Sequence, residues 1–486
     1  MTYIVAIDAG TTGVRSRAVF SDGREAIASY LEFTQHFPSP GLVEHDADEI
    51  WNVTRRTLAD VVTRVGSLPA AIGITNQRET VVAWDRATGT TFGRAIVWQD
   101  RRTAQRCIEL APHLGTVRAA TGLVLDPYFS GTKIEWMLHN GVSVSPTLAF
   151  GTIDSWLLWK LTNGEVFATD ESNASRTMLW DITAHSWSAE LCDLLGVPMT
   201  SLPEVRDSSG RFGITSVDGV PSGIPISGIA GDQQAALFGQ ACFSEGEAKN
   251  TYGTGSFILM NAGGNCPAPS EGMLTTVAWR IAGVTTYAVE GSIFVTGAAV
   301  QWLRDGLGII RESRDIETLA ARVDDSGGVV FVPALTGLGS PWWDAQARGA
   351  VFGITRGTTA AHLALATLEA MAYQTRDVVE AMTAATGIPI STLRVDGGAA
   401  GNDRLMQIQA DQLGIVVERP VDRETTAVGA ALLAGLAEGV WASPDEAAAS
   451  RRIDRRFEPN TELKVFADIA HAQWRSGVRR VTPNCP

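Results

Sequence analysis

The chain has 486 residues, of which 45% are hydrophobic and 19% are charged, a composition typical of globular proteins. This length exceeds what one hydrophobic core usually serves and predicts two domains of roughly 240 residues each. The net charge of −14 argues against a general binder of nucleic acid or of anionic membranes. It also means that any phosphate ligand must be held by local donors and metal.

Cysteine usage and the N-terminus predict where the protein works. No C-x-x-C pair occurs, and the odd number of cysteines favours reduced thiols over a disulfide framework or a zinc site. The N-terminus enters a strand without a basic segment, and no apolar stretch approaches the ~18 residues of a membrane helix. The sequence therefore predicts a cytoplasmic protein with no signal peptide and no integral membrane association. The five cysteines are Cys107, Cys192, Cys242, Cys266 and Cys485.

The first half of the chain alternates short apolar runs with helical patterns. Residues 3–7 and 14–20 predict two strands joined by a turn, and residues 48–65 carry apolar side chains at helical spacing. Residues 70–75 and 80–84 predict two more strands. Such alternation is typical of α/β architecture.

Loops follow this alternation, and the chain ends with helices. Residues 201–227 are rich in Pro, Gly and Ser and predict loops and short strands. Helical patterns return at 362–386 and 402–413, and 427–440 predicts a helix of small residues suited to close packing on a sheet. Residues 249–260, KNTYGTGSFILM, predict a second hairpin with a glycine–threonine turn.

The turn of the first hairpin admits two interpretations. Gly10, Thr11, Thr12 and Gly13 are ordinary turn-forming residues, and Asp8 before them bonds its own backbone readily in turns. The same residues also suit a phosphate site, because glycines let backbone N–H groups approach an anion and threonine hydroxyls add donors. An aspartate beside phosphate requires a divalent cation between them, so this hypothesis includes Mg²⁺.

The two hairpins also admit two interpretations as a pair. Gly10 and Gly253 stand 243 residues apart, which is half the length of the chain. Two phosphate-type hairpins, one in each domain, would suit a ligand clamped in a cleft between the domains. Two unrelated β-turns are the alternative.

An acid follows a predicted strand in ISGIAGDQQAALFG. Asp232 comes after the strand at 226–229 and before a helix that starts at Gln233, which is a favoured place for an N-cap. The alternative is functional, because open α/β sheets bind ligands at the carboxyl ends of their strands. There, Asp232 could accept the proton of an attacking hydroxyl in phosphoryl transfer.

Arg78 and Glu79 form a charged pair between two apolar strands in GITNQRET. Adjacent opposite charges usually form a solvated rim, but this connection is too short to extend far. A guanidinium donates to hydroxyl oxygens and a carboxylate accepts from hydroxyl hydrogens, so the pair would suit a small polyol.

A third glycine-rich segment, at 396–402, is a further nucleotide candidate. It follows a strand at 393–395 and precedes a helix, where backbone could approach a ribose and the helix N-terminus favours anions. A strand–helix connection also needs no ligand. Neither G-x-x-x-x-G-K-[ST] nor G-x-G-x-x-G occurs, which excludes a P-loop NTPase and weakens a dinucleotide-dependent dehydrogenase.

Taken together, nine segments closely resemble the glycerol kinases, members of the sugar-kinase family with the actin and hexokinase ATPase fold. They are DAGTT, GITNQRET, DPYFSGTK, NASRTM, ISGIAGDQQAALFGQ, NTYGTGSF, QWLRD, TGLGSPWWD and RVDGGAAGN, in the family's order from about residue 3 to 440. The resemblance implies an α/β fold of two ribonuclease H-like ATPase domains, at 1–245 and 246–486, with the active site in the cleft between them.

The resemblance further implies ATP-dependent phosphorylation of glycerol to sn-glycerol 3-phosphate with Mg²⁺, the first step of glycerol catabolism, with Asp232 as general base. The implied glycerol-binding residues are Arg78, Glu79, Trp98, Tyr128, Asp232, Gln233 and Phe257. The implied nucleotide-binding residues are Thr11, Thr12, Gly13, Arg15, Thr254, Gly297, Gln301, Gly398 and Asn402, and the metal would be held at Asp8 and Asp232. Glycerol and ATP are the expected partners, nucleic acid is not, and a homodimer or homotetramer is expected.

Three positions depart from the family pattern. Ala9 and Gly13 stand where Gln and Ser are usual, and Trp342 stands where Tyr is usual, beside the expected nucleotide cleft. Gly13 loses a hydroxyl donor to the phosphates and keeps its backbone N–H, which predicts weakened but not abolished ATP binding.

A fourth departure concerns regulation. Many bacterial glycerol kinases bind the inhibitor fructose 1,6-bisphosphate in the loop that corresponds to residues 216–228. Here that loop holds no Arg or Lys and contains Asp218, and Arg211 is the nearest cation in sequence. Because a bisphosphate needs paired cations, the sequence predicts no inhibition by this sugar.

Three other functions stay as alternatives. A kinase of a larger polyol or sugar, such as xylulose or erythritol, would share the ATP half and differ only around the substrate. An ATP-driven protein of the actin or chaperone type would not need the polyol-binding side chains. A catalytically dead homologue is the third, against which stand the intact Asp8 and Asp232.

Overall fold

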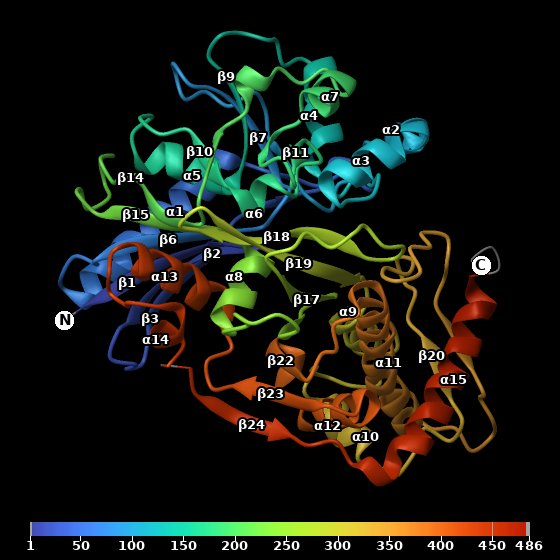
Figure 1. Ribbon diagram of the computed structural model, residues 1–486. Helices are drawn as coiled ribbons and strands as arrows, with labels where there is room; N and C mark the ends of the chain where they lie inside the picture. The colour runs from blue at the N-terminus through green and yellow to red at the C-terminus, as the bar shows by residue number, and fades with distance from the viewer. Residues whose placement is uncertain (1, 450, 483–486) are drawn as a thin grey trace.

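The computed structural model describes residues 2–449 and 451–482, and Cys485 lies outside them. A 13-stranded sheet runs through the whole molecule, in the order β24-β23-β22-β16-β17-β19-β18-β14-β15-β6-β1-β2-β3. Helices cover both of its faces (Figure 1). Its strands are β1 (Tyr3–Ala9), β2 (Gly13–Phe20), β3 (Ile27–Glu32), β6 (Ala71–Asn76), β14 (Ser209–Ile214), β15 (Pro225–Gly231), β16 (Ala248–Tyr252), β17 (Ser256–Gly263), β18 (Leu274–Ile281), β19 (Val284–Ile293), β22 (Thr392–Gly397), β23 (Val416–Pro420) and β24 (Ile453–Phe457).

Smaller sheets and the helices complete the described chain. A five-stranded sheet joins β4 (Gln35–His36), β5 (Glu44–His45), β8 (Ala95–Ile96), β7 (Val81–Asp85) and β9 (Leu148–Thr152). Three strand pairs are β10 (Ala168–Asp170) with β13 (Glu204–Arg206), β11 (Trp180–Asp181) with β12 (Ser186–Trp187), and β20 (Val330–Val332) with β21 (Ala350–Phe352). The helices are α1 (Ala47–Val65), α2 (Ala104–Glu109), α3 (Leu114–Thr121), α4 (Ser130–His139), α5 (Ile153–Leu161), α6 (Glu171–Ala174), α7 (Ala189–Leu194), α8 (Asp232–Gly239), α9 (Gly297–Gln301), α10 (Asp315–Ala320), α11 (Ala360–Thr386), α12 (Asp403–Leu413), α13 (Thr425–Ala437), α14 (Pro444–Ala448) and α15 (Lys464–Val481).

The parallel core of the sheet aligns the strand ends that carry the candidate site. Strands β1 and β15 both pair in parallel with β6, and Ala9 and Gly231 both lie opposite Asn76. The carboxyl ends of three strands that are far apart in sequence therefore meet at one edge. Because ligands bind at this edge in open α/β sheets, the residues that follow these strands are brought to one place.

Both predicted hairpins form. β1 and β2 pair antiparallel around the turn at Gly10, and β16 and β17 do so around the turn at Gly253. The second hairpin lies beside the glycine turn after β22, because Tyr252 pairs with Gly397 in parallel register.

The helix of small residues, α13, packs as its composition predicts. It lies against β1, β6, β15 and α8, and a Cβ on Gly73 would stand only 2.1 Å from the carbonyl oxygen of Ala430. The helix ends at Ala437, so the prediction that it reaches residue 440 is wrong. Gly439 adopts φ +69°, and such a left-handed residue terminates a helix.

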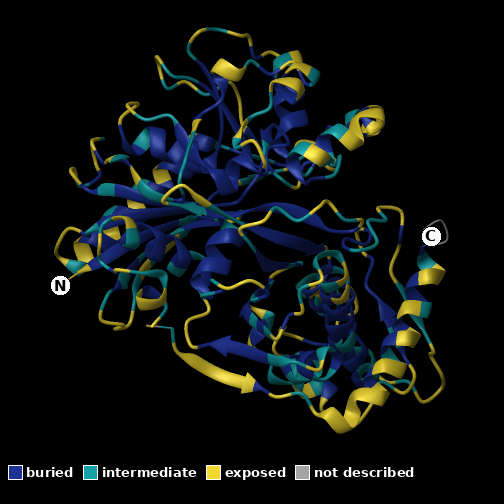
Figure 2. Ribbon diagram, in the orientation of Figure 1, coloured by how far each residue is buried: buried dark blue, intermediate teal, exposed yellow. Residues whose placement is uncertain are grey.

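The two halves of the chain contribute opposite ends of the sheet. The junction between them runs through β14 and β18, which share the single registered pair Ser209 and Ile281. Buried residues fill both sides of the sheet (Figure 2). The division into domains at 1–245 and 246–486 stays a prediction, since α13 from the second half packs on strands of the first. Among the described residues no helix is long and apolar enough to cross a bilayer.

Candidate active site

Asp232 opens helix α8 at the end of β15, and the N-cap of this helix is Gly231. The interpretation of Asp232 as the N-cap is therefore wrong. Its Oδ1 accepts a hydrogen bond from the N–H of Gln233 at 2.7 Å and lies 3.2 Å from Nε of Arg78. Its side chain keeps 29% of its surface exposed, which leaves one face open to a ligand.

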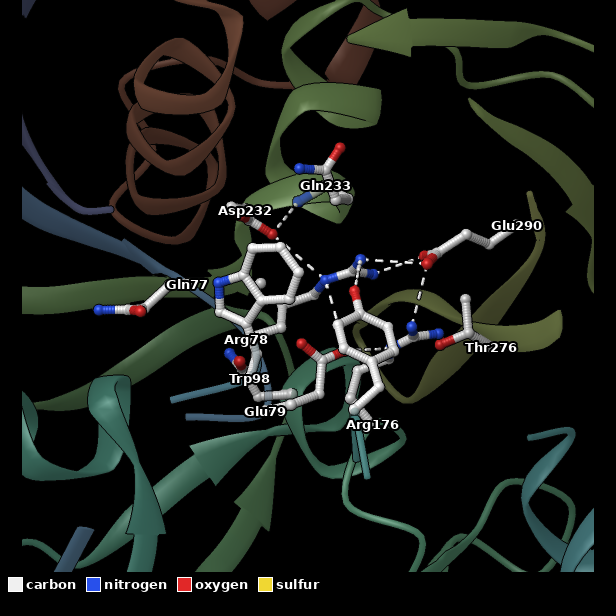
Figure 3. A network of polar contacts seen from close by, with 12 residues as sticks. Gln77, Arg78, Glu79, Trp98, Arg176, Asp232, Gln233, Thr276 and Glu290 are labelled. Carbon is white, nitrogen blue, oxygen red and sulfur yellow. Dashed lines mark hydrogen bonds and ion pairs between the residues drawn. The ribbon is translucent and has the colours of Figure 1, made fainter. Parts of the chain in front are cut away.

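Arg78 is the centre of a buried polar network (Figure 3). It is 2% exposed and donates through both terminal nitrogens to the carboxylate of Glu290, at 2.6 and 3.1 Å. It also donates to the Tyr128 hydroxyl at 3.1 Å and to the side chain of Gln234 at 3.2 Å. With Asp232 at its Nε, this guanidinium is fixed from every side, so it presents a rigid donor.

Glu79 is equally buried, at 1% exposure, and the interpretation of Arg78 and Glu79 as a solvated rim is wrong. Its Oε1 accepts from Nε of Arg176 at 2.7 Å, and Ser130 donates to its backbone carbonyl. The residue adopts φ +61°, a conformation that costs a non-glycine residue on the order of 1 kcal/mol and that is retained at many functional sites.

Two charged residues of this network, Arg176 and Glu290, were missed by the sequence analysis, and they balance its charges. Arg176 bridges Glu79 and Glu290, so two arginines face two glutamates, and Asp232 adds one further acid. Burial alone would raise the pKa of Glu290, but the charges of Arg176 and Arg78 lower it to about 2. Glu290 is thus ionised and holds both guanidiniums in place.

The electrostatic setting of Asp232 differs from that of Glu290. Burial raises the pKa of its carboxyl above the ordinary value, and the charges of Arg78 and Lys249 only partly offset this. A carboxylate with a raised pKa is a better proton acceptor, which is what a general base requires.

Aromatic side chains wall the space beside this network. The ring of Trp98 lies edge-on to Tyr128 and to Phe257, with centroids 5.6 and 6.3 Å apart. The guanidinium of Arg78 stands 5.9 Å from the ring of Phe257. The structure therefore brings the polar and apolar residues predicted for a polyol pocket together.

Lys249 contacts two residues of the predicted pocket, and the sequence analysis also missed it. It is fully buried, and its ammonium group donates to Gln233, to the Thr251 hydroxyl at 2.9 Å and to the carbonyl of Phe257 at 3.2 Å. Burial lowers its pKa to about 8. The signal for it in the sequence is a lysine in the first strand of a predicted hairpin, which is buried in the fold, where a charge is costly without partners.

The first hairpin lies next to the aromatic wall. The indole N–H of Trp98 donates to the Thr11 hydroxyl at 3.1 Å, and the hydroxyls of Thr12 and Tyr30 lie 3.2 Å apart. Arg15 forms an ion pair with Glu424, at the start of α13. These residues surround the turn predicted to bind phosphate.

Asp8 and Asp232 fit the predicted metal site. Burial raises the pKa of Asp8 to about 7, Arg15 lowers it, and the negative charges of Asp232 and Glu424 raise it further. Mg²⁺ usually takes only one or two protein carboxylates and completes its shell with water and phosphate. No group of three or more His, Cys, Asp or Glu side chains that could hold a metal occurs among residues 2–449 and 451–482, and metal binding by Asp8 and Asp232 stays a prediction.

The second hairpin and its neighbours approach each other mainly through backbone. The carbonyl of Thr254 accepts from the N–H groups of Thr296 and Ala298, and a Cβ on Gly297 would stand 2.4 Å from the carbonyl oxygen of Gly253. The side chain of Asn402 caps α12 by accepting from the N–H of Leu405 at 2.8 Å. Gln301 ends α9 and is exposed, and Gly398 follows β22. Nucleotide binding by these residues stays a prediction.

The structure shows where two of the residues that depart from the family pattern lie. Ala9 is fully buried at the end of β1. Trp342 lies under the guanidinium of Arg475 from α15, at 5.7 Å, and packs on a cluster that includes Trp474. Its described contacts therefore involve the C-terminal helix.

Two arginines lie near the loop at 216–228. Arg211 forms an ion pair with Glu438, whose Oε1 also accepts from the hydroxyl of Ser227 in the loop. Arg55 of α1 also approaches the loop, with Nη1 2.9 Å from where a Cβ on Gly219 would stand.

The buried charge cluster, the two glycine–threonine hairpins and the large mixed sheet define a kinase with the actin and hexokinase type of ATPase fold. Models of the FGGY family of carbohydrate kinases match the chain over residues 3–239 for the N-terminal domain and 248–438 for the C-terminal domain. The chain belongs to this family.

Relatives of known name cover nearly the whole chain. The chain is 53% identical to a glycerol kinase of Deinococcus radiodurans over 98% of its own length and 97% of the relative. It is also 53% identical to a glycerol kinase of Carboxydothermus hydrogenoformans, covering 98% of each. The crystal structure of Plasmodium falciparum glycerol kinase with ADP superimposes with a TM-score of 0.93 and 34% identity, covering 99% of this chain and 98% of that one.

More distant structures share the fold alone. A ligand-bound xylulose kinase from Lactobacillus acidophilus superimposes with a TM-score of 0.90 at 19% identity, covering 100% of this chain and 99% of that one. The backbone fold therefore does not determine which substrate is bound. The side chains of the pocket must determine it.

Proposed function

We propose that the chain phosphorylates glycerol with ATP to give sn-glycerol 3-phosphate, with Asp232 as the general base. The observation that carries the proposal is the pairing of Asp232 with Arg78, 3.2 Å apart, at the open side of a buried charge cluster. The rings of Trp98, Tyr128 and Phe257 lie beside the cluster, and the partly exposed Asp232 gives a ligand access to it. The relatives named glycerol kinase support the same substrate.

The pocket would hold glycerol through complementary donors and acceptors. Arg78 would donate to hydroxyl oxygens, while Glu79 would accept from a hydroxyl hydrogen through the oxygen that does not face Arg176. Tyr128 and Gln233 would complete these bonds. Trp98 and Phe257 would contact the carbon backbone, where apolar walls discriminate by about 1–3 kcal/mol per methylene.

The chemical step follows from the place of Asp232. Its carboxylate accepts the proton of a terminal hydroxyl, and that oxygen forms a bond to the γ-phosphorus of ATP while the bond from this phosphorus to the bridging oxygen breaks. ADP leaves with the electron pair of that bond. A weak base suffices, because the transition state is loose and the proton leaves late.

The nucleotide would lie across the two hairpins. Thr11, Thr12, Gly13 and Arg15 would meet its phosphates from the first hairpin and Thr254 from the second. Gly297, Gln301, Gly398 and Asn402 would line the nucleoside side. Asp8 and Asp232 would hold Mg²⁺, which when bound neutralises charge on the phosphates.

A panel of acceptors tests the function. ADP release is measured in a coupled assay with ATP and glycerol, erythritol, xylulose or no acceptor. We expect the highest kcat/KM with glycerol and little ADP release without an acceptor. A preference for xylulose would favour the kinase of a larger substrate, and equal ADP release without any acceptor would favour an ATPase of the actin type.

Two broader properties belong to the proposal. We place the enzyme in the cytoplasm, where ATP is abundant, and the four described cysteines are free thiols as expected there. An assembly of two or four copies stays a prediction, which light scattering on the purified protein would test.

A further inference from the structure

Tyr30 on strand β3 lies over the turn of the first hairpin. Its strand neighbour across the β2–β3 ladder is Arg15, and Gly13 lies diagonally opposite it. A Cβ on Gly13 would stand 2.7 Å from the Tyr30 hydroxyl and 2.8 Å from its ring. The phenol therefore occupies the space into which a side chain at position 13 would extend.

The hydroxyl of Tyr30 lies among three residues proposed to meet phosphate. It is 3.2 Å from the hydroxyl of Thr12, and the guanidinium of Arg15 stands 5.4 Å from the centre of its ring. Tyr30 is 42% exposed, so the ring is packed on one side and open on the other. On its packed side the ring lies against the buried Gly13.

We propose that the Tyr30 hydroxyl is a phosphate donor of the first hairpin, in the place that a side chain at residue 13 would otherwise fill. This inference rests on the proposed binding of ATP at that hairpin. Two hydroxyls in contact share one hydrogen between them and leave the other free for an outside acceptor. With Thr12 donating to Tyr30, the free hydrogen is that of the phenol.

The surrounding residues fit this assignment. The ring contact with Arg15 restricts both side chains, so the donor and the cation are held together. Gly13 is required by the arrangement, because any larger residue would also stand 2.6 Å from the carbonyl oxygen of Leu31. Gly13 and Tyr30 are thus a matched pair, and the missing side chain at residue 13 is compensated from the neighbouring strand.

Calorimetric titration of the purified full-length chain with ATP and with AMP tests the proposal. Tyr30→Phe keeps the ring and removes only the hydroxyl. We expect its Kd for ATP to rise about tenfold, as for loss of a hydrogen bond to a charged group, and its Kd for AMP to change less than twofold. The matched control is Ser29→Ala on the same strand, whose side chain points to the other face of the sheet.

Three results would overturn the assignment: an unchanged Kd for ATP in Tyr30→Phe, an equal rise for ATP and AMP, or the same rise in Ser29→Ala. An equal fall in melting temperature for the two variants, with no change in ATP binding, would assign Tyr30 a packing role only. Failure of the proposed function is distinguishable, since it would appear as a wild-type protein that binds ATP without phosphorylating glycerol.

Discussion

The polyol pocket and the nucleotide side of the cleft are built in opposite ways. Around Arg78 the charged side chains are buried and bonded to one another. On the nucleotide side Thr12, Thr254 and Gln301 are exposed, and the two hairpins are held mainly by backbone. A pocket that binds a small neutral molecule must be rigid to discriminate it from similar molecules. The side chains of a site for a highly charged ligand can instead become ordered when that ligand binds.

The comparison also separates two kinds of buried acid. Glu290 and Asp154 are both fully buried, but Glu290 faces two arginines, whereas the side chains that donate to Asp154 are the hydroxyls of Thr152 and Thr169. The pKa of Glu290 falls to about 2, while burial raises that of Asp154 to about 7. The two arginines therefore outweigh burial at Glu290, whereas burial outweighs the hydroxyl hydrogen bonds at Asp154.

Removing Arg78 should produce the largest effect on the pocket. Arg78→Ala leaves Glu290 without its bidentate partner, and loss of one member of a buried pair costs about 3–5 kcal/mol. We expect a KM for glycerol at least a hundredfold higher and a lower melting temperature. Phe257→Leu is the matched control, which removes apolar wall only and should raise this KM less than tenfold. The reverse order of the two variants in steady-state kinetics would contradict the roles assigned to them.

Replacing Asp154 should show how a buried acid that is not paired with an arginine affects the stability of the fold. Its folded-state pKa lies above the unfolded value, so the folded chain binds the extra proton and the free energy of unfolding falls as pH rises from about 4 to 7. Asp154→Asn removes this dependence. Urea unfolding should find the variant more stable than the wild type by about 2 kcal/mol at pH 8 and by less at pH 5. An equal difference at both pH values would remove Asp154 as the cause.

Replacing Arg15 should weaken the binding of ATP and leave the binding of glycerol unchanged. Its ion pair with Glu424 is partly exposed and therefore weak, so the guanidinium can turn to phosphate. We expect Arg15→Ala to raise the KM for ATP about tenfold, as for loss of a charged hydrogen bond, and to leave the KM for glycerol unchanged. Glu424→Gln is the control and should leave the KM for ATP equal or lower. A change in the KM for glycerol that matches the change for ATP would break the separation between the two regions.

Fructose 1,6-bisphosphate should not inhibit the enzyme, so its effect on activity is the smallest of all. Arg55 and Arg211 both lie beside the loop at 216–228, but Arg211 is paired with Glu438, which leaves Arg55 for a ligand. One arginine is insufficient for a bisphosphate against the net charge of −14. Assays with millimolar sugar bisphosphate at physiological ionic strength should show unchanged activity. Saturable inhibition that disappears in Arg55→Ala would show that the loop still forms a site.

The sequence predicts the hairpins and the adjacent pair Arg78 and Glu79, because each is a local pattern. It does not predict Glu290, which lies 212 residues from Arg78 in an ordinary strand and acquires its role only when β19 is placed in the sheet. It also leaves Asp232 open between a cap and a base, since both need an acid at the start of a helix. In the folded chain Gly231 takes the N-cap position, which excludes the cap. The role of Asp232 as base stays a proposal, and the burial and the neighbouring Arg78 that support it are not visible in a local pattern.

Kinetics and glycerol binding of Asp232→Asn test the central claim most directly. The substitution keeps the size and the hydrogen-bonding capacity of the side chain and removes its ability to accept a proton at neutral pH. If Asp232 is the base of glycerol phosphorylation, kcat falls by about 10²–10⁴ while the Kd for glycerol, measured by calorimetry, changes less than fivefold. A variant that turns over glycerol at nearly the wild-type rate would contradict the mechanism.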